Sequence, residues 1–349
     1  MDFLKKRDLI LDVFILFISS ISLLSLFSVS EFYFKQQAIF LMIGLIMYLL
    51  IPFVRLDTYT LIFPLVCISI LCLLIYLAFF GASVRGSASW VDLGPFNFQP
   101  SEFTKFIIIF LCSNILSKHI SSFKKLLYIA LFSIPFIVFT LLQPDLGTSS
   151  VLIFIVLSLL FISLMTPKSF IFSVILVCVI GFLGYNFVLK PYQKERIYSF
   201  LNPQSDPLGS GYNVIQSKIA IGSGGIFGKG FKQNTQVSLN FLPEPHTDFI
   251  FSAGAETFGL IYSVFVVVIV FSFVYWIFYN YFLKQKQVFK MYFAFGAFSV
   301  FFVQIFLNIG MNMGLLPVTG LTLPLISYGG SSLLAFLIIL GFLQLFNFE

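Results

Sequence analysis

Long apolar runs, separated by short breaks rich in polar residues, Pro or Gly, extend along nearly the whole chain. A membrane-spanning helix needs about 20 mostly apolar residues, and cutting the sequence at these breaks leaves ten runs of roughly that length. The break at about 190–247, between the seventh and eighth runs, is much longer than the others. The pattern predicts ten transmembrane helices, approximately at Leu9–Val29, Gln36–Phe53, Tyr59–Phe80, Ser101–Leu116, Leu126–Leu142, Thr148–Met165, Ser169–Leu189, Phe249–Tyr281, Val288–Met311 and Leu325–Phe346.

Composition agrees with this pattern. The chain has 349 residues, of which 59% are hydrophobic and 10% charged, and its mean hydropathy is +1.03. A soluble domain is far less apolar and more charged. We therefore predict an all-α integral membrane protein, with residues 1–349 as one polytopic domain and with no nucleic acid among its partners. The first run has no cleavage site of small residues, so we expect it to remain as a span.

The basic residues predict the orientation. An even number of spans places both termini on one side, and cytoplasmic loops are enriched in Lys and Arg. With a cytoplasmic N-terminus, the short outside loops hold only Lys35 and Arg85. The inside segments then hold Lys5, Lys6, Arg7, Arg55, Lys118, Lys124, Lys125, Lys168, Lys284, Lys286 and Lys290. We predict that both termini are cytoplasmic and that the long loop at 190–247 is extracytoplasmic.

Acidic residues concentrate at the predicted outer ends of the spans. In QPSEFTKF, Glu102 and Lys105 are three residues apart and share a helix face, which predicts an ion pair at the rim of the fourth span. The alternative is that Glu102 only serves the helix dipole while Lys105 extends to the interface. Asp145 follows a similar Gln-Pro pair in QPDLG. Because charge inside a span is costly, acids at span entrances indicate a site or a partner. The alternative is that each acid simply caps a helix.

The segment FLPEPHTDFIF places three polar residues directly before the eighth span. Its two prolines predict extended geometry at Leu242 and Glu244. Glu244, His246 and Asp248 would then alternate and face one way, with Thr247 as the helix N-cap. We expect Asp248 to lie at the height of the lipid headgroups. An acid there can meet the sugar or phosphate of a lipid-linked molecule without being buried in hydrocarbon.

The long loop contains GSGGIFGKG at 222–230, which matches neither the Walker nor the dinucleotide pattern. Its glycines allow backbone amides to approach a ligand closely, and Lys218, Lys229 and Lys232 supply positive charge nearby. An anionic ligand and a flexible surface loop remain alternative interpretations of this segment.

Five segments together resemble the SEDS family (shape, elongation, division and sporulation) over nearly the whole chain. FGKGFKQNTQ and LNFLPE are more similar to the elongation branch, RodA, than to the division branch, FtsW. The five segments are, in order, WVDLGPFNFQPSEFTK, QPDLGT, DPLGSGYNVIQSKIAIGSGGIFGKGF, LNFLPEPHTDFIF and GLLPVTGLTLPLISYGGSS.

The resemblance implies a peptidoglycan glycosyltransferase of the cytoplasmic (inner) membrane that polymerises lipid II at the outer face, for cell elongation and rod shape. It implies a class B penicillin-binding protein and other elongation complex components as partners. By the resemblance, Asp248 is the catalytic acid, Glu102 and Lys105 are required, and Trp90 and Asp145 are further site residues.

The sequence departs from the family pattern at two places. Ser89 stands where the family usually has Arg, and Arg85 is the nearby basic residue that could replace it. In the eighth span, Glu256 is followed by Thr257 instead of a second Glu. Roles that depend on the usual residues do not carry over.

The chemistry of the implied reaction fits these residues. A sugar hydroxyl attacks an anomeric carbon with inversion while a lipid diphosphate leaves, so one base and nearby cations suffice. We predict Asp248 as the base, with Glu244 and His246 shaping its surroundings. Candidate substrate-binding cations are Lys105, Arg196, Lys218 and Lys229. A divalent cation, Mg²⁺ or Mn²⁺, on Asp248 is an alternative source of charge, although no dense ligand cluster indicates one.

A second class of function is a lipid II transporter (flippase). A transporter should place polar groups in broken helices near the bilayer midplane, and only Pro64 and Pro135 indicate such breaks. A third interpretation is a scaffold that recruits the transpeptidase. The position of the acids at the outer entrances favours the polymerase.

Overall fold

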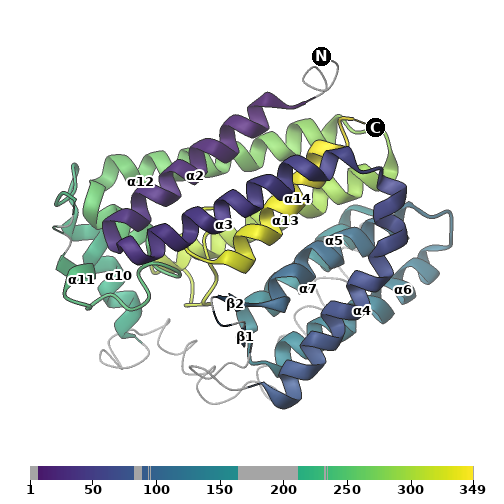
Figure 1. The fold of residues 1–349 in the computed structure, drawn as a ribbon, viewed down its shortest axis with the longest axis horizontal. Coiled ribbons are helices and arrows are strands. Elements are labelled where there is room, and N and C mark those ends of the chain that lie inside the picture. The colour runs from purple at the N-terminus through teal and green to yellow at the C-terminus, as the bar shows by residue number, and fades with distance from the viewer. Residues whose placement is uncertain are drawn as a thin grey trace.

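The computed structural model describes residues 7–81, 89–92, 94, 96–163, 211–231, 233 and 235–348, which form a bundle of long helices (Figure 1). A short antiparallel hairpin pairs β1 (Val91–Asp92) with β2 (Asn97–Phe98). The helices are α2 (Leu9–Val29), α3 (Glu31–Leu50), η1 (Ile51–Phe53), α4 (Leu56–Phe80), α5 (Pro100–Ser117), α6 (Ser122–Leu142), α7 (Leu146–Ser163), α10 (Tyr212–Ser223), α11 (Thr235–Ser238), α12 (Ile250–Trp276), η4 (Ile277–Leu283), α13 (Val288–Asn312) and α14 (Gly330–Leu345).

The predicted spans agree with this arrangement wherever the structure describes them. Each predicted span other than the seventh coincides with a described helix, although α3 begins at Glu31 and α14 only at Gly330. The seventh span, at 169–189, lies outside the described residues, as do Arg85, Arg196 and Lys232. Of the described helices, 7 are long and apolar enough to cross a membrane. Helices α5 and α14 are not in this group.

The start of α2 and the end of α14 lie at one end of the bundle, here called the terminal end (Figure 1). The backbone N–H of Asp8, before α2, donates to Gln344 Oε1 near the end of α14 at 3.0 Å. The hairpin, α10 and α11 lie away from this end (Figure 1). The opposite end, called the loop end, holds Val29, Pro100 and Ile250. The shared position of the first and last described helix ends agrees with an even number of spans.

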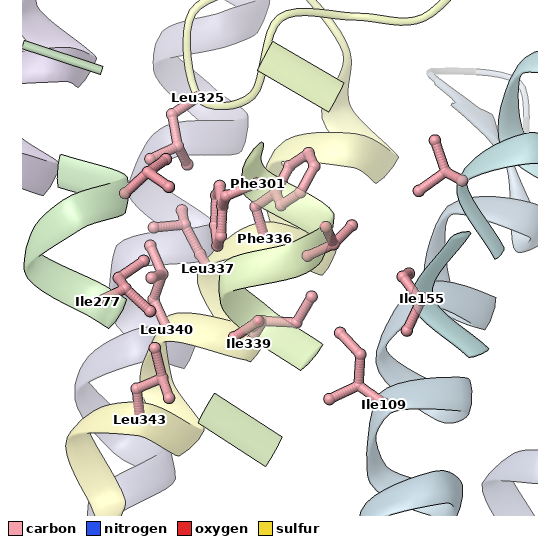
Figure 2. Packing of buried hydrophobic residues seen from close by; sticks show 14 of the residues in the cluster. Ile109, Ile155, Ile277, Phe301, Leu325, Phe336, Leu337, Ile339, Leu340 and Leu343 are labelled. Carbon is pink, nitrogen blue, oxygen red and sulfur yellow. The ribbon is translucent and has the colours of Figure 1, made fainter. Parts of the chain in front are cut away.

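The centre of the bundle consists of α5, α13 and α14. A helix that is apolar on all sides belongs in the interior, and most residues of α5 and α14 are buried. Figure 2 shows the packing of Phe301 of α13 and Phe336 of α14, with Ile109 of α5 and Ile155 of α7 nearby. By contrast, α4 at the periphery buries only Ile70, Leu74 and Leu77. This interior fixes the helices that carry the polar residues of the loop end.

Helix α12 is interrupted at Gly259, which has φ 82° and ψ −167°. The loop at 224–230 bridges the interruption, because Leu260 N donates to Gly225 O at 2.9 Å and Gly230 N donates to Thr257 O at 3.0 Å. A Cβ on Gly228, whose φ is +80°, would collide with the Thr257 carbonyl. The glycine-rich segment therefore supplies backbone partners to a broken helix, which corrects its interpretation as a flexible surface loop.

The positions of helix interruptions differ from the predicted ones. Pro64 and Pro135 lie inside α4 and α6, and both helices continue through them. In the described part of the chain, the non-helical break within a long helix is at Gly259, in the half of α12 that begins at Ile250. The prolines therefore do not mark midplane breaks.

Candidate active site at the loop end

Asp248 lies in a turn just before α12 and is partly buried. The prediction that Thr247 caps this helix is wrong. Phe249 is the N-cap residue and makes no side-chain cap bond, while Thr247 Oγ1 lies 3.5 Å from Glu244 O. Asp248 is therefore outside the helix that follows it.

The segment before Asp248 is a turn, and the predicted extended geometry at Glu244 is also wrong. Glu244 has a positive φ of 46°. Its carbonyl accepts bonds from the N–H groups of Thr247 and Phe249, each at 3.3 Å. Since two backbone donors converge on one carbonyl, the chain folds back on itself here. The two prolines do not produce an alternating strand.

His246 packs between aromatic and acidic groups at this turn. Its ring stacks on Tyr33 of α3, with centroids 3.7 Å apart and planes at 9°. Its Nε2 lies 3.6 Å from Glu244 Oε2. The carbonyl of His246 accepts the N–H of Tyr328 at 2.9 Å. Glu244 and His246 therefore lie in the turn that precedes Asp248, and their role in shaping its surroundings stays a prediction.

The segment before α14 lies against the Asp248 turn. Ser327 Oγ donates to Thr247 O at 2.6 Å, and a Cβ on Gly320 would lie 3.7 Å from Asp248 Oδ2. Gly320 has a φ of +70° and carries no side chain into this space. The carboxylate of Asp248 therefore faces backbone that approaches it closely.

The predicted ion pair between Glu102 and Lys105 is present. Lys105 Nζ lies 2.8 Å from Glu102 Oε2, and the exposed fractions of the two side chains are 0% for Lys105 and 7% for Glu102. Lys105 also donates to Gln304 Oε1 of α13 at 2.9 Å. The burial of Lys105 rules out the alternative in which it extends to the interface. Such a pair is costly to desolvate and depends on good geometry.

Asp145 lies close to this pair, between α6 and α7. Its Oδ1 accepts the N–H of Thr148 at 2.9 Å, which caps the start of α7. Its Oδ2 lies 3.4 Å from Ser101 Oγ and 3.3 Å from Gln99 Nε2. Burial raises the pKa of Asp145, whereas the bond from Thr148 lowers it and the nearby charge of Glu102 raises it. The structure therefore brings Asp145 to the Glu102 cluster.

Three amide side chains of α13 connect these two acidic groups. Gln304, Asn308 and Asn312 recur every four residues, are fully buried, and lie on one face of the helix. Gln304, which binds Lys105, donates to Thr322 O at 3.0 Å. Asn308 donates to Leu321 O at 2.6 Å and to Asp248 O at 3.1 Å. Through Gln304 and Asn308, the Glu102–Lys105 pair and Asp248 are thus linked to neighbouring residues of the same loop.

Sequence reasoning missed these amides, although a signal was present. Polar amides at a spacing of four inside a 25-residue apolar helix are as unusual as charges and indicate a site. Tyr33 was also missed. Its neighbours are a mixture of aromatic and polar residues, so no local pattern distinguishes it.

The predicted cations lie in different environments. Lys229 Nζ binds Glu256 Oε1 and Thr235 Oγ1, both at 2.7 Å, and Glu256 is fully buried. Lys218 is exposed on α10 with its side chain against Gly314. Arg196 lies outside the described residues. Of these three, Lys218 is the described one that lies on the surface.

The remaining predicted site residues lie at the hairpin. Trp90, next to β1, is 41% exposed. Ser89 is buried, and its hydroxyl lies 3.5 Å from the Gln143 carbonyl. Within the described ranges, no group of three or more His, Cys, Asp or Glu side chains gathers as a metal site.

Comparison with known proteins matches residues 7–347 to the family FtsW, RodA and SpoVE, described as cell cycle proteins. The chain is 36% identical to stage V sporulation protein E of Bacillus subtilis, over 96% of this chain and 95% of that protein. It is 38% identical to the peptidoglycan glycosyltransferase MrdB of Escherichia coli, over 76% of this chain and 72% of that protein.

Solved structures share the fold. A chain from a study of how a peptidoglycan synthase complex coordinates polymerisation and crosslinking aligns with a TM-score of 0.83 and 30% identity, covering 98% of this chain and 97% of that one. The rod shape determining protein RodA of Thermus thermophilus aligns with a TM-score of 0.73 and 26% identity, covering 98% and 96%. The chain therefore belongs to the FtsW, RodA and SpoVE family, the SEDS family that its sequence motifs resemble.

Proposed function

We propose that this protein polymerises lipid II into glycan strands at the outer face of the cytoplasmic membrane. Relatives from Escherichia coli and Buchnera are named peptidoglycan glycosyltransferases or probable ones. The observation that carries the proposal is the position of Asp248, directly before the spanning helix α12. The backbone carbonyl of Asp248 accepts hydrogen bonds from the buried amides of Asn308 and Asn312. A carboxylate held in this way can accept a proton from a sugar hydroxyl.

The reaction joins two lipid-linked disaccharides. The acceptor hydroxyl attacks the anomeric carbon of the donor, its proton passes to Asp248, and the bond to the lipid diphosphate breaks with inversion. A diphosphate leaves as a stable anion, so the reaction needs positive charge near it more than a general acid. Lys218 is a described cation on the surface of the loop end that can supply this charge.

A divalent cation near Asp248 is an alternative source of positive charge for the leaving diphosphate. Mg²⁺ is often held by one or two carboxylates together with substrate phosphates, so Asp248 with the lipid diphosphate would provide its ligands. When bound, the ion would supply positive charge to the leaving group. Asp248 would then orient that ion in addition to holding the acceptor proton.

We propose different roles for Glu102 and Asp145. Lys105 is sealed by Glu102 and Gln304, so in this conformation the pair stabilises the loop end instead of touching substrate. Asp145 retains a carboxylate that is costly to bury. Costly ionisable groups often lie at functional sites, which supports a role for Asp145 in the polymerase.

The partner and the cellular role follow the family. We propose a class B penicillin-binding protein as the transpeptidase partner, because one solved relative comes from a complex that couples polymerisation to crosslinking. The resemblance to RodA favours cell elongation. The identities of 36%, 38% and 40% with sporulation, MrdB and division relatives are too similar to separate these roles.

Purified protein in vesicles tests the function directly. With lipid II and its partner, the wild type should produce glycan strands. Movement of labelled lipid II across the bilayer, measured in parallel, would reveal a transporter. Transbilayer movement without any polymer would overturn the proposal. Repeating the polymerisation with a chelator, then with added Mg²⁺ or Mn²⁺, tests the cation separately.

A further inference from the structure

The end of α13 holds Asp248 through a side-chain amide inserted into the backbone of α12. In a regular helix the carbonyl of Asp248 would accept the N–H of Ser252, four residues later. Here Ser252 N donates to Asn312 Oδ1 at 3.1 Å. Asn312 Nδ2 in turn donates to Asp248 O at 2.9 Å. The Asn312 amide thus stands between two groups that a longer helix would join directly.

This insertion fixes the orientation of the Asn312 amide. A backbone N–H can only donate and a backbone carbonyl can only accept, so its oxygen must face Ser252 and its nitrogen must face Asp248. Ser252 Oγ donates to the same oxygen at 2.6 Å. Ser217 Oγ of α10 donates to the backbone carbonyl of Asn312 at 2.7 Å. Asn312 provides the N-terminal cap that Phe249 does not.

Asn308 adds a second bond to the same carbonyl and links it to the loop before α14. Its Nδ2 donates to Asp248 O at 3.1 Å and to Leu321 O at 2.6 Å. Leu321 is next to Gly320, whose backbone approaches the Asp248 carboxylate. The Asn308 amide therefore holds both Asp248 and the backbone near Gly320 that the Asp248 carboxylate faces.

We infer that Asn308 and Asn312 are positioning residues for Asp248, an inference that rests on the proposed role of Asp248 as base. Without them, the carbonyl of Asp248 would regain Ser252 N, and α12 would extend by a turn toward Asp248. That change rotates the Asp248 side chain away from its present direction. A misplacement of about 1 Å can cost about 100-fold in rate.

Steady-state polymerisation by Asn308→Ala and Asn312→Leu, in vesicles with the partner, tests the inference. We expect kcat to fall about 100-fold while KM for lipid II stays within about twofold, because binding groups elsewhere are unchanged. Gln344→Ala is the matched control. Gln344 is also a buried amide that bonds backbone and side chains, but it lies at the terminal end. Its kcat per folded molecule should equal that of the wild type.

Combining Asn308→Ala with Asp248→Glu in one protein distinguishes a positioning role of Asn308 from an effect on overall stability. In the Asp248→Glu background, the carboxylate is already displaced, so Asn308→Ala should lower kcat much less than it does in the wild type. Equal loss in both backgrounds, or wild-type kcat in folded Asn308→Ala, would overturn the inference. Should Asn308→Ala fail to fold, Asn308→Leu keeps the side-chain volume and carries the same measurement. Wild-type activity in Asp248→Ala would instead overturn the proposed function itself.

Discussion

Each end of the helix bundle holds a buried polar cluster, and the two clusters are built differently. At the terminal end, Asp8 Oδ2 accepts bonds from Trp276 Nε1 and Tyr281 Oη, both at 2.9 Å. Gln344 donates to Asp8 O and accepts from Asp8 N. These bonds join the start of α2 to the ends of α12, η4 and α14.

The loop end uses its amides on irregular backbone instead. Asn308 and Asn312 hold a turn and a loop that lie outside the described helices and strands. Asp8, Asp12 and Asp248 are all partly accessible, but Asp248 lies against irregular backbone whereas Asp8 contacts helix ends. The terminal cluster joins helix ends, whereas the loop cluster holds Asp248, the base in the proposed function. The role of a buried polar group in a membrane protein thus depends on whether it contacts helix ends or irregular backbone.

The largest expected effect on stability comes from breaking the Glu102–Lys105 pair. Lys105→Met leaves the buried Glu102 without its cation, and such a loss costs about 3–5 kcal/mol. Arg7→Met at the terminal end should cost much less, because both side chains of the Arg7–Asp12 pair retain some exposure, 14% and 17%. Thermal unfolding in detergent measures both variants. Equal losses would show that burial does not distinguish the two pairs.

An intermediate effect is expected at the loop that bridges α12. Gly228→Ala adds a Cβ toward the Thr257 carbonyl at a φ of +80°, and backbone strain of this kind costs about 1–3 kcal/mol. The loop at 224–230 should detach from α12, which breaks the Lys229–Glu256 contact and makes the backbone near residue 228 accessible to proteases. Gly222→Ala, where an added Cβ meets nothing within 4 Å, is the control. Unchanged protease resistance in Gly228→Ala would contradict the bridging role.

The smallest effect on stability is expected for Asp145→Asn. Asn retains the cap to Thr148 N and removes a carboxylate whose pKa is raised by burial. The folded wild type therefore holds this proton more tightly than the unfolded chain, so its stability falls as pH rises through the raised pKa. Asp145→Asn should lack that fall and be at least as stable at pH 7.

Unfolding midpoints of wild type and Asp145→Asn across about pH 4–8 provide this comparison. A variant that is less stable than the wild type at pH 7, with the difference vanishing at pH 4, would mean that the pKa of Asp145 is lowered. Glycan polymerisation measured on the same samples shows whether the loss of the carboxylate lowers activity at unchanged stability.

The sequence predicted the described long helices well, because each of these spans is a long apolar run. It predicted the contact of Glu102 with Lys105 because a spacing of three fixes neighbours on a helix. It could not predict the turn at Glu244, because the two prolines indicate extended geometry, whereas bonds from Ser327 and Tyr328 to this segment accompany a turn.

The cap of α12 was missed for a similar reason. Local rules assign caps to residues that directly precede a helix, whereas Asn312 is 60 residues away from Ser252 in the chain. Long-range partners of this kind leave only an indirect trace in the sequence. Here the trace was three amides at helical spacing in an apolar helix.

The rate of glycan polymerisation by Asp248→Asn, compared with Asp8→Asn at equal amounts of folded protein, tests the central claim most directly. The two substitutions remove one carboxylate from each cluster, and Asn at position 8 can still cap α2. We predict that Asp248→Asn loses about 100- to 10,000-fold in kcat, the usual contribution of a general base, while Asp8→Asn keeps the wild-type rate. Normal polymerisation by folded Asp248→Asn would contradict the account.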